Sequence, residues 1–241
     1  MRLDQYLVQK GFETSRERAK RSIKNGLVKV NDTIQTKVST VITEDDRVKV
    51  IDTALKRVSQ GATKLEKMLL NFDLDLNNKK ALDIGASTGG FTEVLLEQGV
   101  EKVISLDIGT DQLHSSLAAN SRVISMEGTD FREIGSDALP FQPEVIVCDV
   151  SFISITEILR SIKEKWNGPL EFLGLIKPQF EMTERFKVKN GIIKNEKWRT
   201  QAINKTKLCA TELGFKQNGE IIVAAGDGIQ KNIEYGIHLS L

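Results

Sequence analysis

The sequence has few cysteines and few histidines, which limits the chemistry it can support. Its two cysteines, Cys148 and Cys209, lie far apart, as expected for buried reduced thiols rather than a disulfide framework or a metal cluster. Its two histidines, His114 and His238, lack the spacing of a ligand pair, and we interpret both as structural. We therefore expect no metal.

Long hydrophobic runs are also absent. No stretch approaches the roughly 18 to 20 apolar residues of a membrane-spanning helix, and the first residues do not form a secretory hydrophobic region. Apolar residues still make up 40% of the 241 residues, which is enough for a core. We expect a soluble, cytoplasmic protein without a membrane partner.

The net charge of +1 conceals an uneven distribution. Residues 1–60 contain 13 Lys and Arg against 8 Asp and Glu, a net charge of +5, so the rest of the chain carries −4. Five cations fall on a helix predicted over residues 15–25 by a capping box and a C-terminal glycine: Arg16, Arg18, Lys20, Arg21 and Lys24. This helix is predicted to contact phosphates, the alternative being a solvated charged face.

Residues 1–52 resemble the RNA-binding fold first named for ribosomal protein S-four. The matching residues are Arg2, Leu3, Asp4, Leu7, Ser15, Arg16, Ala19, Ile23, Gly26, Val28, Val30, Asn31 and Asp46. Asp32 departs from the pattern, which usually has glycine after the asparagine. The resemblance implies an RNA-binding domain, with its linker, over residues 1–58, in which Arg2 and the five helix cations contact RNA.

From residue 59 to residue 241, strand and helix patterns alternate. Apolar strands are predicted at 81–84, 103–106, 123–126, 145–148, 170–176 and 219–223. Amphipathic helices are predicted at 63–71, 91–98, 155–165 and 198–213. This order predicts an α/β domain with a mainly parallel sheet and helices on both faces.

A glycine-rich turn follows the first of these strands. Its residues are Asp83, Gly85, Ala86, Ser87, Thr88, Gly89, Gly90 and Phe91. The glycine spacing differs from that of a dinucleotide site, and the missing Lys-Ser or Lys-Thr pair excludes a P-loop. A carboxylate at the mouth of the turn would repel phosphate but attract the amino group of a methionine moiety.

Acids also end the next two strands. Asp107, followed by Ile108, is placed to accept both hydroxyls of an adenosine ribose. Asp130 and Phe131 suit the amino group and the ring of adenine. The alternative is that these acids are ordinary turn residues at strand ends.

The second domain resembles the Rossmann-like class I methyltransferases, and among them the TlyA (haemolysin A) family, related to the FtsJ ribose methyltransferases. Six segments carry the resemblance and begin at Gly61, Asp83, Asp107, Cys148, Ile176 and Asn232. It implies transfer of a methyl group from S-adenosylmethionine to a ribose 2′-hydroxyl of ribosomal RNA, at a cytidine, in a ribosomal subunit or in free RNA. Gln60 and the loop 226–231 depart from the family pattern.

The resemblance also implies a catalytic tetrad, matched here by Lys64, Asp149, Lys177 and Glu234. A lysine can remove the hydroxyl proton only in its neutral form, which a neighbouring cation favours. Lys177 is therefore the candidate base, Lys64 tunes it or orients the hydroxyl, and the two acids position the lysines.

Two other functions stay open. A non-catalytic RNA-binding or ribosome-assembly factor could keep the fold as a scaffold, although the intact tetrad argues against it. A membrane-active haemolysin fits poorly, because the sequence has neither a spanning segment nor an amphipathic helix with a wide aromatic face. The sequence does not determine the subunit, the nucleotide or whether the chain forms a homo-oligomer.

Overall fold

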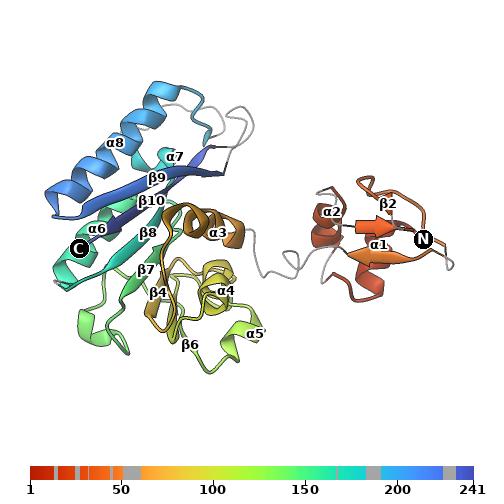
Figure 1. Ribbon diagram of the computed structural model, residues 1–241, viewed down its shortest axis with the longest axis horizontal. Coiled ribbons are helices and arrows are strands. Elements are labelled where there is room, and N and C mark those ends of the chain that lie inside the picture. The colour runs from red at the N-terminus through yellow and green to blue at the C-terminus, as the bar shows by residue number, and fades with distance from the viewer. Residues whose placement is uncertain are drawn as a thin grey trace. The chain divides into compact units, whose positions relative to one another are not determined.

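The computed structural model describes residues 1–13, 16–24, 28–31, 33–43, 46–50, 61–166, 168–182, 191–224 and 232–241. Its contacts divide the chain into two compact units, Met1–Arg57 and Val58–Leu241 (Figure 1). The predicted boundary at residue 58 lies outside the described residues. No helix in the described ranges is both long enough and apolar enough to cross a membrane.

The N-terminal unit is a helical pair followed by a small antiparallel sheet. Helices α1 (Leu3–Gln9) and α2 (Arg16–Lys24) precede strands β1 (Val28–Val30), β2 (Thr33–Ile34) and β3 (Val48–Val50), arranged in the order β2-β1-β3. Its core is formed by apolar residues from both helices and the sheet, including Leu3, Leu7, Ala19, Ile23 and Val28. Asn31 forms the β1–β2 turn with a left-handed φ of 52°, which asparagine tolerates better than most residues.

The second unit is built on a seven-stranded sheet with the order β6-β5-β4-β7-β8-β10-β9. Its strands are β4 (Lys80–Ile84), β5 (Lys102–Leu106), β6 (Val123–Met126), β7 (Val145–Cys148), β8 (Glu171–Ile176), β9 (Lys216–Ala224) and β10 (Glu234–Ser240). Strands β4 to β8 pair in parallel, whereas β10 is antiparallel to both β8 and β9. The predicted mainly parallel α/β sheet is therefore confirmed.

Helices cover both faces of this sheet, as Figure 1 shows. The helices are α3 (Gly61–Phe72), α4 (Gly90–Glu97), α5 (Ser115–Ala118), α6 (Ile155–Lys165), α7 (Pro178–Glu181) and α8 (Glu196–Glu212), with a short 3-10 turn at Ser136–Ala138. Apolar residues of α3 and α4 share one core cluster, whereas those of α6 and α8 belong to another. The sheet is thus buried between two helical layers, as its nearly continuous apolar strands require.

The strand order reverses next to β4, because β5 and β6 lie on one side of it and β7 and β8 on the other. In such sheets the loops after the two central strands diverge and leave a crevice at their carboxyl ends. The loop after β4 closely approaches the loop after β7 at Gly85, where φ is +82° and a Cβ atom would lie 3.0 Å from the backbone oxygen of Asp149. Glycine is therefore required where the two loops meet.

Candidate active site

The four residues predicted as a tetrad come together at the carboxyl ends of the central strands. Lys64 projects from α3, Asp149 follows β7, Lys177 follows β8, and Glu234 begins β10. The Nζ atom of Lys64 lies 2.7 Å from Oε2 of Glu234 and 3.3 Å from Oδ2 of Asp149. The Nζ atom of Lys177 lies 2.5 Å from Oδ1 of Asp149. Asp149 thus links the two lysines.

Strand register explains why Glu234 reaches this cluster. Strand β10 runs antiparallel to β8 with Tyr235 opposite Ile176. The preceding residue of β10 therefore lies beside Lys177, the residue that follows β8. On α3, Ala62 and Leu65 are buried in the core, which leaves Lys64 directed to the rim of the sheet. Residues distant in the chain are thus placed together by the backbone.

The cluster combines two cations with two carboxylates, largely removed from solvent. The side chains of Lys64 and Lys177 are 19% and 9% exposed. Burial works against the charge of Lys64, but the carboxylates of Asp149 and Glu234 outweigh it and raise the pKa of this lysine above its ordinary value. Lys64 is therefore held as a cation between two carboxylates.

Two cavities meet at this cluster. The smaller, about 270 Å³, is lined by Gly61, Lys64, Gly85, Ala86, Ser87, Thr88, Gly90, Phe91, Asp149, Ser151 and Lys177. The larger, about 580 Å³, is lined by residues that follow β4, β5, β6 and β7, among them Asp107, Ile108, Asp130 and Phe131. Gly85, Ser87, Asp149 and Ser151 line both, so most of the predicted cofactor residues adjoin the same crevice as Lys64, Asp149 and Lys177 of the tetrad.

Asp107 is fixed at the edge of the larger cavity by two backbone amides. Ser87 N donates to its Oδ2 at 2.8 Å, and Gly109 N donates to its Oδ1 at 2.7 Å. Each carboxylate oxygen can accept further hydrogen bonds, so this residue can still receive hydroxyl groups. Its geometry suits the ribose contact predicted from the sequence.

Asp83 and Gly89 are the predicted cofactor residues that line neither cavity. Asp83 is fully buried behind the glycine-rich turn, where Thr92 Oγ1 donates to its Oδ2 at 2.7 Å. Its Oδ1 has no hydrogen-bond partner among the described residues, and burial raises the pKa of this carboxyl to about 7. Gly89, with φ +94°, has a packing role, because a Cβ atom there would lie 2.2 Å from the side chain of Leu117.

At the far end of the larger cavity, Asp130 is paired with Arg132, whose Nη2 lies 2.5 Å from Oδ2. Phe131 is only 2% exposed and stacks on Trp166, with ring centroids 6.2 Å apart. The ring therefore belongs to the core as well as to the cavity wall. Only part of Phe131 is available to a ligand.

An exposed aromatic residue beside the tetrad had no assigned role in the sequence-based prediction. Phe152, three residues after Asp149, lines the larger cavity, is 91% exposed and has a left-handed φ of 68°. Its ring lies 5.2 Å from that of Phe180 at an angle of 48°. A bulky side chain in this backbone region is rare and strained. The sequence marks Phe152 as part of a motif, but neither its backbone angle nor its exposure can be read from it.

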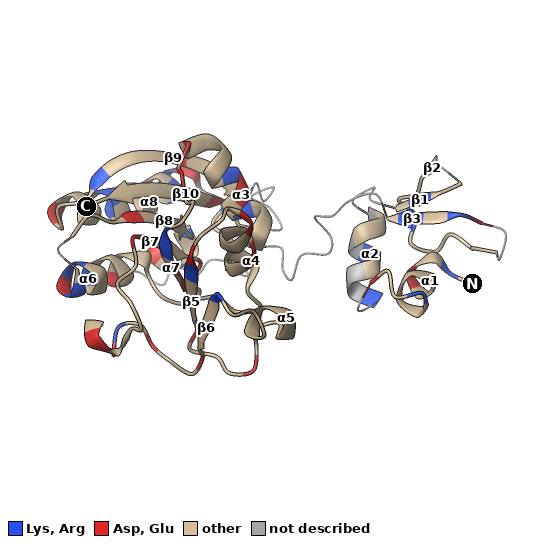
Figure 2. Ribbon diagram, turned by 60° about the horizontal axis from the view of Figure 1, so that its bottom comes forward, with Lys and Arg blue, Asp and Glu red and all other residues tan. Residues whose placement is uncertain are grey.

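In the N-terminal unit, two of the predicted RNA-binding residues are held by one buried acid. Arg2 Nε and Arg16 Nη2 each lie 2.9 Å from the carboxylate of Asp4, which is fully buried. Although burial opposes its charge, the hydrogen bonds and charges of both arginines lower the pKa of Asp4. Lys20 is half-buried on α2, and the side chains of Arg18, Arg21 and Lys24 lie outside those described. Figure 2 shows where the described cations of this unit lie.

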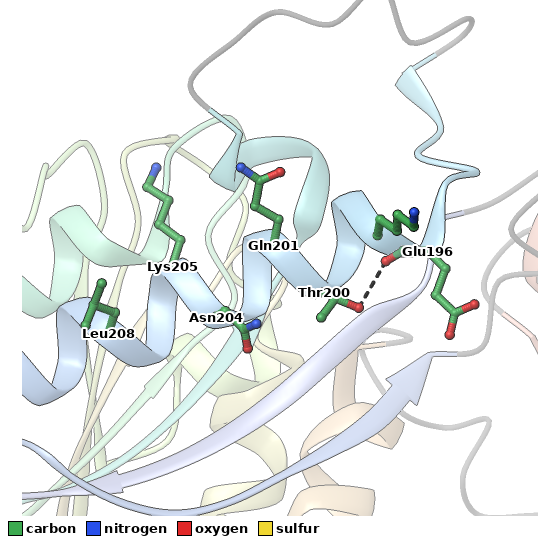
Figure 3. Close-up of a pocket in the computed structure, with 7 residues that line it drawn as sticks. Glu196, Thr200, Gln201, Asn204, Lys205 and Leu208 are labelled. Atoms are coloured by element: carbon green, nitrogen blue, oxygen red, sulfur yellow. Dashed lines mark hydrogen bonds between the residues drawn. The ribbon is translucent and has the colours of Figure 1, made fainter.

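A separate cavity of about 690 Å³ lies along α8 and contains none of the predicted site residues (Figure 3). Its lining residues are Glu196, Lys197, Thr200, Gln201, Asn204, Lys205 and Leu208. They all come from a single helix, so the cavity lacks the converging polar groups of a built ligand site.

Comparison with known proteins identifies a family for each of the two units. The FtsJ-like methyltransferase family matches residues 57–238, and the S4 domain family matches residues 1–48. Hemolysin A of Brachyspira hyodysenteriae is 39% identical over 239 residues, covering 99% of each chain. The protein named 16S/23S rRNA (cytidine-2′-O)-methyltransferase TlyA of Mycobacterium tuberculosis is 32% identical, covering 99% of this chain and 89% of its own.

Solved structures give the same relationship. A structure described as a hemolysin from Streptococcus thermophilus superposes with a TM-score of 0.74 at 34% identity, covering 100% of this chain and 88% of its own. The chain, which joins an FtsJ-like domain to an N-terminal S4 domain, is therefore an enzyme of the FtsJ-like methyltransferase family and belongs to the TlyA (hemolysin A) group.

Proposed function

We propose that this enzyme transfers a methyl group from S-adenosylmethionine to the ribose 2′-hydroxyl of a cytidine in ribosomal RNA. The observation that carries the proposal is the cluster of two lysines and two acids at the point where two cavities meet. The name of the Mycobacterium tuberculosis relative supports the choice of ribosomal RNA and cytidine. A ribosomal substrate also implies that the enzyme works in the cytoplasm.

The larger cavity fits the proposed cofactor. Its volume of about 580 Å³ lies in the range of small-molecule sites. The Asp107 carboxylate is oriented to accept ribose hydroxyls, Asp130 and Phe131 border the position proposed for adenine, and the turn at Gly85 and Ser87 provides close backbone approach. S-adenosylmethionine supplies an electrophilic methyl group when bound.

The residues of the tetrad would remove the proton of the ribose 2′-hydroxyl. A ribose hydroxyl becomes a better nucleophile when its proton is removed as the new oxygen–carbon bond forms. Neutral Lys177 accepts this proton at Nζ, becomes an ammonium stabilised by Asp149, and later releases the proton to water. Lys64, held charged by Asp149 and Glu234, orients the hydroxyl oxygen.

RNA as the substrate is supported by features of both units. In the catalytic unit, the exposed ring of Phe152 offers a stacking surface for a nucleobase beside the tetrad. In the N-terminal unit, the side chains of Arg2 and Arg16 are 45% and 52% exposed, which suits them to contact RNA phosphates.

The test is transfer of labelled methyl from S-adenosylmethionine to small subunits, large subunits and naked ribosomal RNA, followed by nucleoside analysis by mass spectrometry. We expect 2′-O-methylcytidine from at least one of these substrates. Labelled base with unlabelled ribose would contradict the proposed reaction. A different 2′-O-methylated nucleoside would contradict cytidine alone.

A further inference from the structure

Ser151 lies in the loop between β7 and α6, beside the candidate base. Its side chain is exposed, and it lines both the cofactor cavity and the smaller cavity of the tetrad. Lys177 Nζ donates a hydrogen bond to its Oγ at 2.9 Å. The hydroxyl is therefore in the reaction crevice and in direct contact with the group that would exchange the substrate proton.

The two contacts of Lys177 differ in what they control. Its ion pair with Asp149 depends mainly on the distance between charges, and so fixes where the nitrogen lies. A hydrogen bond also requires alignment of donor and acceptor, and so fixes the direction of an N–H group. Within the described chain, the hydrogen bond to Ser151 is the directional contact of this nitrogen.

Direction matters because a lysine side chain has a flexible four-carbon stem and a nitrogen that rotates. One N–H group of Nζ points to Ser151, and the ion pair keeps the nitrogen close to Asp149. Together these contacts restrict the direction in which the lone pair of the neutral amine can point. A base whose lone pair is aimed at the hydroxyl begins proton transfer from a reactive geometry.

We propose that Ser151 is a positioning residue that aims the Nζ atom of Lys177 at the ribose 2′-hydroxyl. This inference rests on the proposed function, because it assigns Ser151 a role in that reaction. Ser151 does not itself exchange the proton. It accepts an N–H from Lys177 both before and after proton transfer.

The fold keeps Ser151 and Lys177 together through a buried acid. Glu181, in helix α7 that begins directly after Lys177, is 1% exposed. Its Oε1 accepts a hydrogen bond from Ile155 N at 2.9 Å, and its Oε2 contacts the hydroxyl of Ser154. The loop that carries Ser151 is thus tied to the helix that follows Lys177, so the two groups are held in register.

The test compares Ser151→Ala, Ser151→Thr and the exposed control Ser136→Ala in steady-state methyl transfer to the ribosomal substrate. We expect Ser151→Ala to lower kcat by about 10- to 100-fold, while the KM for RNA and the Kd for S-adenosylmethionine stay within about twofold. Threonine keeps the hydroxyl and should restore most of kcat. Ser136→Ala should match the wild type.

Three results would overturn the inference. An unchanged kcat in Ser151→Ala would show that the hydroxyl does not position the base. A raised KM for RNA with unchanged kcat would make Ser151 a substrate-binding residue instead. If Ser151→Thr is as impaired as Ser151→Ala although both variants keep the wild-type Tm, the hydroxyl is not the group that matters. Failure of the wild type to methylate any RNA would instead refute the proposed function, and this inference with it.

Discussion

Lys64 and Glu234 form an ion pair, with 2.7 Å between Nζ and Oε2, that joins the first helix of the catalytic unit to its last strand. Both side chains are less than one-fifth exposed. The same lysine contacts Asp149, so among the described residues its removal would leave Glu234 without its ion-pair partner and Asp149 paired with Lys177. The tetrad therefore contributes to stability as well as to chemistry.

A double-mutant cycle on Lys64→Met and Glu234→Gln measures this contribution. Each single change should lower the free energy of unfolding by about 1 to 3 kcal/mol, with a coupling energy of roughly 0.5 to 3 kcal/mol, because each leaves a charged partner behind. Since the pKa of Lys64 is raised, the contribution should be fully present at neutral pH and be lost only as pH rises through that elevated pKa. Urea denaturation at pH 7 measures it, and simple additivity would contradict the pairing.

Two variants of Phe152 distinguish the effect of backbone strain on stability from the effect of the aromatic ring on substrate binding. Replacing it with glycine should relieve about 1 to 3 kcal/mol of strain at φ 68° against a chain-entropy cost of about 0.5 to 1 kcal/mol, so Tm should not fall. Methyl transfer should still drop, because the variant has no stacking surface. Phe152→Leu, which keeps the strain without the ring, should lose as much methyl-transfer activity as Phe152→Gly. Full activity in either variant would show that the ring of Phe152 does not contribute to substrate binding.

Ionisation of Asp83 should make the free energy of unfolding depend on pH. The pKa of this buried acid is raised to about 7, with Asp149 and Asp107 adding to the effect of burial, whereas in the unfolded chain it ionises near pH 4. The folded state thus binds the proton more tightly, and stability falls as pH rises from about 4 to about 7, by at most about 4 kcal/mol.

The variant Asp83→Asn should remove this dependence. Its Tm relative to wild type should rise between pH 5 and about pH 7 and level off above that, and the exposed control Asp137→Asn should show no such trend. A constant difference across this range would mean that Asp83 ionises normally in the folded protein.

Arg2 and Arg16 should contribute to RNA binding through phosphates. Converting both to glutamine should reduce the log–log slope of affinity against salt by roughly 1.4, about 0.7 for each phosphate that is no longer neutralised. Lys102→Gln, an exposed lysine at the start of β5, is the matched control. Filter binding between low and moderate salt provides the slopes, and an unchanged slope would exclude the two arginines from the interface.

The alternating strands and helices of the second unit could be predicted from the sequence, because local hydrophobic periodicity determines them. Strands β6 and β7 have the predicted limits, and β4 and β5 begin one residue earlier. Strand β10 was not predicted, because Gly236 and His238 interrupt its apolar pattern and long-range pairing with β8 and β9 forms it.

The candidate site could be predicted only where a motif identified its residues. The tetrad was named from such motifs, but its geometry depends on strand register. Asp83 was predicted to contact the cofactor, but it is fully buried and lines neither cavity. The sequence could not show this, because an acid at a strand end has the same sequence pattern whether it faces a ligand or the core. The exposure of Phe152 and the contact of Ser151 with Lys177 depend on loop conformation, which no periodicity encodes.

The most direct test of the account is methyl transfer by Lys177→Ala, with Lys216→Ala, an exposed lysine of β9, as control. Lys177→Ala should lower kcat by about 10²- to 10⁴-fold, the usual contribution of a general base, while RNA affinity and cofactor affinity stay at wild-type values. Wild-type turnover by Lys177→Ala would contradict the assignment of Lys177 as the base and, with it, the proposed role of the tetrad.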